Sequence, residues 1–203
     1  MRKVLIATNN KGKVERFRHL MKHVDPAIAL VTPGDLGISE LDIAEVGKTL
    51  EENALLKAKA YLGATDLPIL ANDTGFYVEG VGLIDAPKRA ALQGAAEHEL
   101  SKEEIAAKLL AFWKGVATER GGRVDAAWLE SFVLMTPDGA SKRADSRREV
   151  VLTDAEFGTA HIQMPVRALY ISKTTNKPAI THTEAEELLE MRPVIEALTK
   201  LLG

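Results

Sequence analysis

The sequence predicts an α/β protein, in which helices alternate with strands early in the chain and strands cluster late. Early on, short apolar runs that end in polar turns precede segments of helical periodicity, whereas alternating apolar residues and turn signals dominate the later part. With 203 residues and 46% hydrophobic content, the chain is long enough for one substantial core or two small lobes that share one. We therefore expect a single domain over residues 1–203.

The first elements expected are a strand, a polar turn and a helix. Residues 3–8 form the strand, because four apolar residues in a row are typical of a sheet covered on both faces. Apolar residues then recur at helical spacing, namely Val14, Phe17, Leu20, Met21 and Val24. A second strand is expected at residues 28–31, followed by an acidic, turn-rich segment at 35–45.

Two capping boxes predict the next helices. Thr49 with Glu52 begins a helix over residues 50–62, which ends at Gly63. Ser101 with Glu104 begins another, with an apolar face made of Ile105, Leu109, Phe112 and Val116. Between them, residues 68–71 predict a strand that ends in the polar turn Asn72-Asp73-Thr74-Gly75.

The later part predicts a β-meander. Residues 124–135 alternate apolar and polar, residues 137–139 form a turn, and residues 147–152 and 166–171 are further strand candidates. Thr183 with Glu186 suggests a third capping box. Because Pro193 would break a long helix, we expect the last helix to start at Pro193 as its first residue.

Composition excludes several classes of protein. The net charge of −3 and pI near 6.0 argue against binding of long nucleic acids, but leave room for a small, metal-complexed anion. The chain has no cysteine, which removes disulfides, thiolate metal sites and a cysteine nucleophile. No run approaches the ~20 apolar residues of a membrane span, and the N-terminal apolar stretch is too short for a signal peptide. We expect a cytoplasmic protein without a membrane or nucleic-acid-polymer partner.

Three segments carry candidate chemistry. The loop from Thr8 to Lys13 lies where a strand ends and a helix begins, so backbone N–H groups, Lys11 and Lys13 favour an anion there; the alternative is an ordinary turn with solvated lysines. Asp73 follows a strand end, where it could bind Mg²⁺ or orient a water, or simply cap a turn. The third segment is acidic and could supply a second metal ligand or form a solvated loop, and it contains Glu40, Asp42 and Glu45.

Two further features have ordinary explanations. Lys57 lies near Glu52 on the same predicted helix, so a surface ion pair is its simplest role. Gly47-Lys48-Thr49 looks like the end of a P-loop, but that motif requires glycine where Asp42 stands, so we reject it.

Taken together, three segments resemble the inosine triphosphate pyrophosphatase family in sequence, order and spacing. They are Thr8-Asn9-Asn10-Lys11-Gly12-Lys13, the segment from Thr49 to Ala58, and the segment from Leu70 to Gly75. The resemblance implies a homodimer, with a two-lobed fold around a long central mixed β-sheet flanked by helices. It also implies hydrolysis of non-standard purine nucleoside triphosphates to the monophosphate and pyrophosphate, with Mg²⁺ or Mn²⁺ as cofactor.

The resemblance also assigns roles to individual residues. Lys13 and Lys57 would grip the triphosphate, and Asp73 would be metal ligand and water-activating base. Glu40 is the best second metal ligand, with Glu45 as the fallback. The substrate-binding set comprises Thr8, Asn9, Asn10, Lys11, Gly12, Lys13, Glu52, Asn53, Lys57, Thr74, Gly75, Lys177 and Arg192.

The later part departs from the family pattern. We expect residues 1–120 to handle phosphate and metal and residues 121–203 to recognise the base. The family's aromatic-Gly-aromatic-Asp-Pro segment is replaced by the segment from Met164 to Ala168, and the family's Asp at position 72 is Asn72. The family's base-reading Ser-His-Arg corresponds either to the segment with His182 or, as we prefer, to Glu190-Met191-Arg192.

Three functions follow from this comparison. The leading one is a nucleoside triphosphate pyrophosphatase with an altered base pocket. The second is a catalytically weak or inactive nucleotide-binding protein on the same scaffold. The third is a hydrolase of a different phosphorylated small molecule. The base and the sugar preferred stay open at this point.

Overall fold

The computed structural model describes residues 2–8, 10–39, 41, 43, 46–94 and 97–203. The chain forms two compact units, which are described separately. Unit 1 comprises Met1–Thr74, Glu130–Ser146 and Pro193–Gly203, and unit 2 comprises Gly75–Leu129 and Arg147–Arg192.

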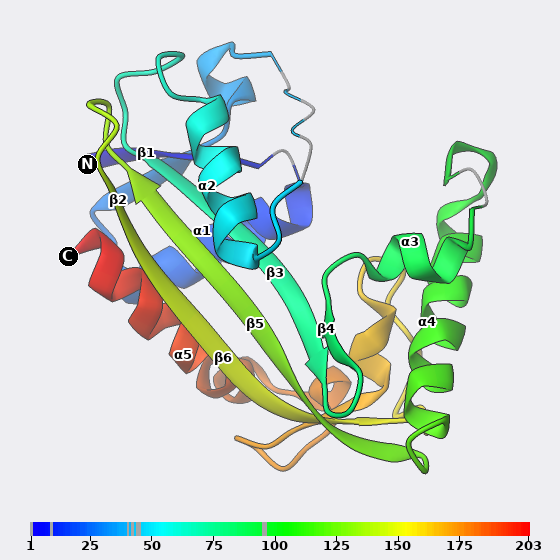
Figure 1. Cartoon of the computed structure of the whole chain (residues 1–203). Coiled ribbons are helices and arrows are strands. Elements are labelled where there is room, and N and C mark those ends of the chain that lie inside the picture. The colour runs from blue at the N-terminus through cyan, green and yellow to red at the C-terminus, as the bar shows by residue number, and fades with distance from the viewer. Residues whose placement is uncertain (1, 9, 40, 42, 44–45, 95–96) are drawn as a thin grey trace. The chain divides into compact units, whose positions relative to one another are not determined.

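Figure 1 labels the helices and strands of the described residues. The strands are β1 (Arg2–Ile6), β2 (Ile28–Val31), β3 (Ile69–Val78), β4 (Gly82–Ile84), β5 (Arg123–Met135), β6 (Ser141–Thr153) and β7 (Tyr170–Ser172). The α-helices are α1 (Lys11–Val24), α2 (Leu50–Ala60), α3 (Pro87–Leu92), α4 (Lys102–Thr118) and α5 (Glu184–Leu202). Short 3-10 helices are η1 (Gly34–Leu36), η2 (Glu97–Glu99), η3 (Pro165–Ala168) and η4 (Ala179–Thr181).

The strands in the described part of the chain form one mixed sheet, in the order β2-β1-β3-β5-β6-β7, with β4 paired to β3. β1 pairs in parallel with both β2 and β3, while β3–β4 and β6–β7 are antiparallel. The α/β class and the mixed sheet are thereby confirmed. β1 is buried from Val4 to Ile6, as expected for a strand covered on both faces.

In unit 1, α1 and α2 cover opposite faces of the sheet (Figure 1). Leu5, Ile69 and Val133 share one buried cluster with Ala54 and Ala58 of α2. On the other face, Phe17 of α1 packs edge-on against Phe132, with ring centroids 6.0 Å apart. Neighbouring residues of a strand point to opposite faces, so the two clusters assign each strand residue to the α1 face or the α2 face.

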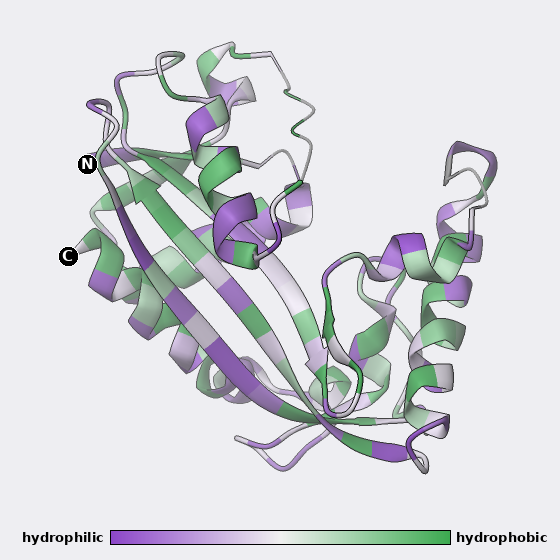
Figure 2. Ribbon diagram, in the orientation of Figure 1, coloured by the Kyte–Doolittle hydropathy of each residue, from purple (hydrophilic) through white to green (hydrophobic). Residues whose placement is uncertain are grey.

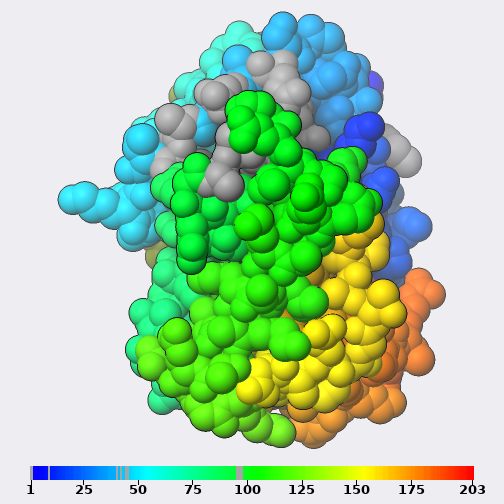
Figure 3. All heavy atoms as spheres, turned by 90° about the vertical axis from the view of Figure 1, so that its right-hand side faces the viewer, coloured from blue at the N-terminus to red at the C-terminus, as the bar shows by residue number. Residues whose placement is uncertain are grey.

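The core of unit 2 is aromatic. Phe76 lies between Trp113 and Trp128, at centroid distances of 5.0 and 4.7 Å, and Trp128 also contacts Tyr170. α4 supplies Trp113 and Ala117 as its fully buried residues; Leu110, Phe112 and Val116 are partly buried against the same core, and the outer side of the helix lies at the surface (Figure 3). The expected apolar face of this helix is therefore only partly buried, because its inner edge is centred on Trp113.

Two of the three predicted capping boxes are complete. The box at Ser101 is complete. At Thr49, the hydroxyl accepts from the Glu52 N–H at 3.1 Å, but the Glu52 carboxylate accepts from the N–H of Lys48 instead of that of Thr49. At Thr183 the box is complete as well: the Thr183 N–H donates to the Glu186 carboxylate at 3.0 Å, and the Thr183 hydroxyl accepts from the Glu186 N–H at 3.4 Å.

That last box shows that the predicted start of the final helix at Pro193 was wrong. α5 begins at Glu184 and continues through Pro193 to Leu202. Proline leaves the carbonyl four residues earlier without its helical donor, at a cost of about 3 kcal/mol, but Met191 and Val194, on either side, are both buried and hold the helix together. No helix in the described ranges combines the length and apolarity that crossing a bilayer requires.

Three strand predictions also need correction. Asn72-Asp73-Thr74-Gly75 is not a turn, because β3 continues through it to Val78. The strand expected at 166–171 is mostly the 3-10 helix η3, and only Tyr170–Ser172 pairs with β6. The alternation expected at 124–135 is incomplete, since consecutive residues of β5 are buried. By contrast, β6 alternates along its hydrophilic stretch, which Figure 2 shows in purple.

Candidate functional site

The N-terminus of α1 presents a positively polarised surface in unit 1. Asn10 is the N-cap, and its side chain accepts a hydrogen bond from the N–H of Lys13 at 3.0 Å. The Thr8 hydroxyl accepts from the N–H of Asn10 at 3.3 Å. The first turn has no acidic residue, and Lys11 is exposed. This helix end is therefore suited to an anion.

Lys13 is the partly buried cation of this helix end. Burial, followed by the positive charge of Lys57, lowers the pKa of Lys13, whereas the charges of Asp73 and Glu130 act in the opposite direction. Among the described residues, none forms a hydrogen bond or ion pair with the Lys13 ammonium group. Because a desolvated ammonium without a close partner is costly, a phosphate oxygen would be a favourable ligand for it.

Lys57 and Asp73 form a shielded ion pair. Lys57 lies near the end of α2 and Asp73 on the α2 face of β3, and Nζ of the lysine is 2.5 Å from Oδ1 of the aspartate. Their side chains are 12% and 7% exposed. The surface ion pair of Lys57 with Glu52, its simplest role from sequence, is not the geometry found.

Asn72 and Thr74 flank this aspartate. The Asn72 side-chain amide donates to the carbonyl of Asp73 at 3.2 Å and to that of Ser131 at 3.3 Å. Its side-chain oxygen accepts from the Thr74 hydroxyl at 3.0 Å. The segment that sequence suggested to be a turn is thus a strand whose polar side chains bond to one another.

Sequence reasoning missed Glu130 and Arg16. Glu130 lies on β5 with no exposed side-chain surface, and its carboxylate is paired with the guanidinium of Arg16 on α1. The available signals were a lone acidic residue inside an apolar run and a basic residue three positions after Lys13, on the same helical face.

The predicted substrate residues at the start of α2 have structural partners. Asn53 is buried, and its side-chain oxygen accepts from the N–H of Gly47 at 2.8 Å. Glu52 is exposed and accepts from the N–H of Lys48 at 2.6 Å. Gly12, in the first turn of α1, is partly buried. Asn9, Glu40 and the fallback ligand Glu45 lie outside the described residues.

The donor set of unit 1 bears on the implied magnesium ion. No group of three or more His, Cys, Asp or Glu residues within the described ranges could hold a metal by itself. Magnesium bound to phosphates commonly takes only one or two protein carboxylates and keeps water ligands. The carboxylate of Asp73, beside two lysines that attract phosphate, fits an ion held mainly by the substrate.

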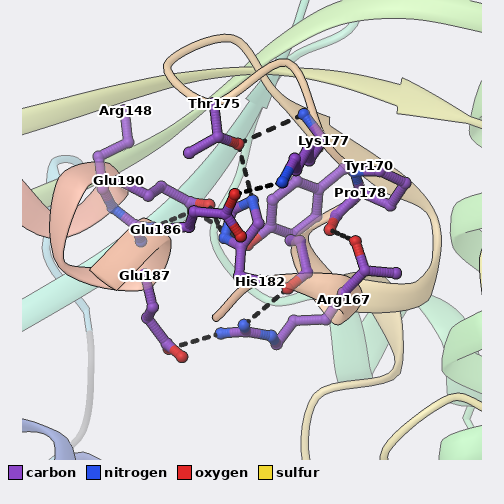
Figure 4. Close-up of polar contacts among 12 residues, drawn as sticks. Arg148, Arg167, Tyr170, Thr175, Lys177, Pro178, His182, Glu186, Glu187 and Glu190 are labelled. Carbon is purple, nitrogen blue, oxygen red and sulfur yellow. Dashed lines mark hydrogen bonds and ion pairs between the residues drawn. The ribbon is translucent and has the colours of Figure 1, made fainter. Parts of the chain in front are cut away.

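Two candidate base-reading residues lie in a polar network of unit 2 (Figure 4). The Lys177 ammonium donates to the carboxylate of Glu186. His182 has no exposed side-chain surface, and its Nε2 is 2.8 Å from the hydroxyl of Thr175. A contact of His182 with a base requires it to leave this network, whereas the Lys177 side chain is exposed and its ammonium has further donors.

Glu190 is the centre of the same network. It accepts from Arg148 at 2.8 Å and from the Tyr170 hydroxyl at 3.1 Å, and it lies 3.3 Å from Nδ1 of His182. Burial, followed by the charge of Glu190, raises the pKa of Tyr170, so its hydroxyl stays a neutral donor.

Arg192, the preferred base reader, is exposed on α5, and Gly75 is buried in β3.

Comparison with known proteins identifies the family of the chain. The model of the Ham1 family matches residues 4–161. The dITP/XTP pyrophosphatase of Symbiobacterium thermophilum is 30% identical over 158 residues, which cover 78% of this chain and 74% of that enzyme. The dITP/XTP pyrophosphatase of Xanthomonas oryzae pv. oryzae is 33% identical over 120 residues, and here the chain spans only 57% of the enzyme's length.

Solved structures agree on the fold. A HAM1 protein from Coxiella burnetii superposes with a TM-score of 0.75 at 18% identity, covering 100% of this chain and 98% of its own. The Staphylococcus aureus Ham1 protein gives 0.72 at 22% identity, covering 99% and 98%. Fold and site define an α/β protein with a shielded lysine–aspartate pair beside a helix N-terminus. The chain belongs to the Ham1 family, which confirms the resemblance drawn from its three motifs.

Proposed function

We propose that the chain hydrolyses non-standard purine nucleoside triphosphates, such as dITP and XTP, to the nucleoside monophosphate and pyrophosphate. The names of its relatives support this reaction. The observation that carries it is the Lys57–Asp73 pair, 2.5 Å apart, with Lys13 and the N-terminus of α1 as further positive groups in unit 1. Two cations and a helix N-terminus suit a polyphosphate, and a shielded carboxylate suits a water-activating base.

The pair suggests how binding and chemistry are linked. Phosphate oxygens compete with Asp73 for the Lys57 ammonium, so substrate binding frees the carboxylate. Asp73 then accepts a proton from a water that attacks the α-phosphorus. The bond from that phosphorus to the bridging oxygen breaks, and pyrophosphate leaves with the new charge stabilised by Lys13 and Lys57.

Asp73 would hold the metal ion, with Glu40 as second ligand. When bound, Mg²⁺, or Mn²⁺ in its place, neutralises phosphate charge and polarises the phosphoryl oxygens. Asp73 is 5% exposed, so its oxygens meet few waters and orient any ligand narrowly. Thr8, Asn9, Asn10, Lys11 and Gly12 would line the phosphates, and Thr74, Gly75, Glu52 and Asn53 would support them.

For the base, we propose Lys177 and Arg192 as contacts. Arg192 is exposed, as a base contact must be before the substrate arrives. We further propose that the protein works as a homodimer in the cytoplasm, in the clearance of damaged nucleotides. The family resemblance supports these assignments, and oligomeric state is tested by light scattering coupled to size-exclusion chromatography.

A nucleotide panel tests the reaction. Purified protein with Mg²⁺ is assayed for pyrophosphate release from dITP, ITP, XTP and the four common nucleoside triphosphates. We expect release from the hypoxanthine and xanthine nucleotides, with little from ATP. Folded protein that releases pyrophosphate from none of them refutes the proposal, and release of orthophosphate instead points to a different bond being cleaved.

A further inference from the structure

Asn72 and Asp73 are neighbours on β3, and their side chains point to opposite faces of the sheet. Asp73 lies on the α2 face with Lys57, whereas Asn72 lies on the α1 face, where its side-chain nitrogen is 3.5 Å from the carboxylate of Glu130. Glu130 shares this face with Phe132, which packs against α1. The Glu130 carboxylate therefore lies on the face of the sheet opposite to the Asp73 carboxylate.

The Asn72 carboxamide spans both sides of Asp73. Its nitrogen donates to the carbonyl of Asp73 at 3.2 Å, and its oxygen accepts from the Thr74 hydroxyl at 3.0 Å. Three acceptors surround that nitrogen, since Ser131 and Glu130 add their oxygens at 3.3 and 3.5 Å. Position 72 therefore requires a donor on this side, and an aspartate there would place an oxygen against these acceptors.

Glu130 is an unusual residue for the middle of a strand. Its side chain has no exposed surface, and Arg16 pairs with it from α1. A buried carboxylate costs several kcal/mol unless it is paired, so an apolar residue would satisfy packing at lower cost. We infer that Glu130 is a positioning residue: together with Arg16 it orients the Asn72 carboxamide, which holds the backbone of Asp73 so that the carboxylate meets Lys57.

This inference rests on the proposed hydrolysis and goes further by adding a residue to it. It also accounts for the amide at position 72. Glu130 on β5 supplies the carboxylate and Asn72 on β3 supplies the amide, and the two side chains contact each other between these neighbouring strands. Exchanging them would keep the net charge but would remove the donor to the Asp73 carbonyl. The negative charge of Glu130 additionally opposes the loss of the proton from Lys13.

The exchange is also the experiment. Glu130→Gln is expected to lower kcat about 10- to 100-fold, the usual effect of removing an outer orienting group, with little change in KM. Asn72→Asp alone is expected to be at least as harmful, because two carboxylates then face each other. The double variant Asn72→Asp/Glu130→Gln relieves the facing charges but still lacks the donor to the Asp73 carbonyl, so its kcat is expected to be no better than that of Glu130→Gln.

A matched control is Glu149→Gln, which alters an exposed, arginine-paired glutamate on β6 and is expected to leave kcat unchanged. If Glu130→Gln fails to fold, Asn72→Ala removes the same amide bridge and keeps the Glu130–Arg16 pair. Binding is followed separately as the thermal shift caused by inorganic triphosphate with Mg²⁺, which should persist in Glu130→Gln.

The outcomes separate the two claims. Wild-type protein without pyrophosphate release overturns the proposed hydrolysis. Active wild type, with a Glu130→Gln variant that melts lower but turns over at the wild-type rate, overturns the positioning role and leaves the hydrolysis standing. A double variant that recovers the wild-type kcat also overturns it, because the amide at position 72 would then be dispensable. Loss of kcat in Glu130→Gln and in the double variant, with retained triphosphate binding, supports it.

Discussion

The Lys57 ammonium lies 2.5 Å from the Asp73 carboxylate, and each group shields the other from solvent. In this arrangement the candidate base and one candidate phosphate ligand neutralise each other. A buried pair of this kind contributes little net stability. Its value in a hydrolase is that an incoming phosphate can displace one partner and release the other.

Asp73→Asn is expected to abolish most turnover. The amide keeps the size of the side chain and still accepts a hydrogen bond from Lys57, but it cannot take a proton from water, so kcat should fall about 10²- to 10⁴-fold. Pyrophosphate release at saturating dITP measures it. The matched control is Asp66→Asn, at an exposed position before β3, which should be neutral. Equal kcat values for Asp73→Asn and Asp66→Asn would show that Asp73 is not the catalytic base.

The lowered pKa of Lys13 predicts that kcat/KM decreases at alkaline pH. Burial and the charge of Lys57 hold its pKa below the 10.5 of an ordinary lysine, and only the protonated form attracts phosphate. We expect kcat/KM to fall as pH rises through this lowered pKa. In Lys13→Arg the fall should move to higher pH, because a guanidinium stays charged. Lys22→Arg, an exposed residue of α1, serves as control and should leave the profile unchanged.

The same shift has a consequence for stability. The folded chain releases the Lys13 proton more readily than the unfolded chain, so burial of the charge costs stability below the folded pKa. That cost is relieved as pH rises from the folded pKa towards 10.5. Relative to Lys13→Met, wild type should therefore gain stability over this alkaline window. A constant difference in urea midpoint across it would contradict the lowered pKa.

Gly47 is expected to tolerate no side chain. A Cβ there would lie 2.6 Å from the Asn53 side-chain oxygen and 2.9 Å from its backbone nitrogen, at the first turn of α2. Gly47→Ala should therefore lower the melting temperature and weaken triphosphate binding, because α2 carries Lys57. Gly34→Ala is the control, since its nearest atom lies 3.8 Å away. A neutral Gly47→Ala would show that this turn shifts freely.

Local sequence patterns predicted the features that depend on residues close together in the chain, namely helix starts and the buried faces of helices. The capping residues Ser101 and Thr49, and the apolar periodicity of α1, specify helix starts and buried faces directly. The grouping of Lys13, Lys57 and Asp73 was implied by the family resemblance, because nothing local to each residue says that the three will meet.

The errors arise where tertiary contacts override local signals. Proline inside α5 and polar residues inside β3 both looked like breaks. In the structure, packing on both sides of Pro193 keeps the helix, and the pairing of Asn72 and Asp73 with distant side chains keeps the strand. Glu130 and Arg16 could not be paired from sequence because 114 positions separate them.

The capping box of α5 predicts acid sensitivity. The Lys177 ammonium, followed by the N–H of Thr183, lowers the pKa of Glu186 from 4.5 to about 2. A carboxyl group with a depressed folded pKa stabilises the fold above its unfolded pKa and loses that effect as pH falls. Glu186→Gln should therefore be less stable than wild type at neutral pH. The gap should close between pH 4.5 and about 2, where the protonated carboxyl resembles the amide.

Urea midpoints measured down this pH range provide the check, with Glu184→Gln as the control in the same turn of α5. Glu184 is exposed and has no capping contact among the described residues, so its variant should show a small difference that varies less with pH. Thr183→Ala removes the cap and should cost about 1 kcal/mol at neutral pH. If the Glu186→Gln gap persists unchanged at acid pH, the ion pair with Lys177 is not what stabilises this helix start.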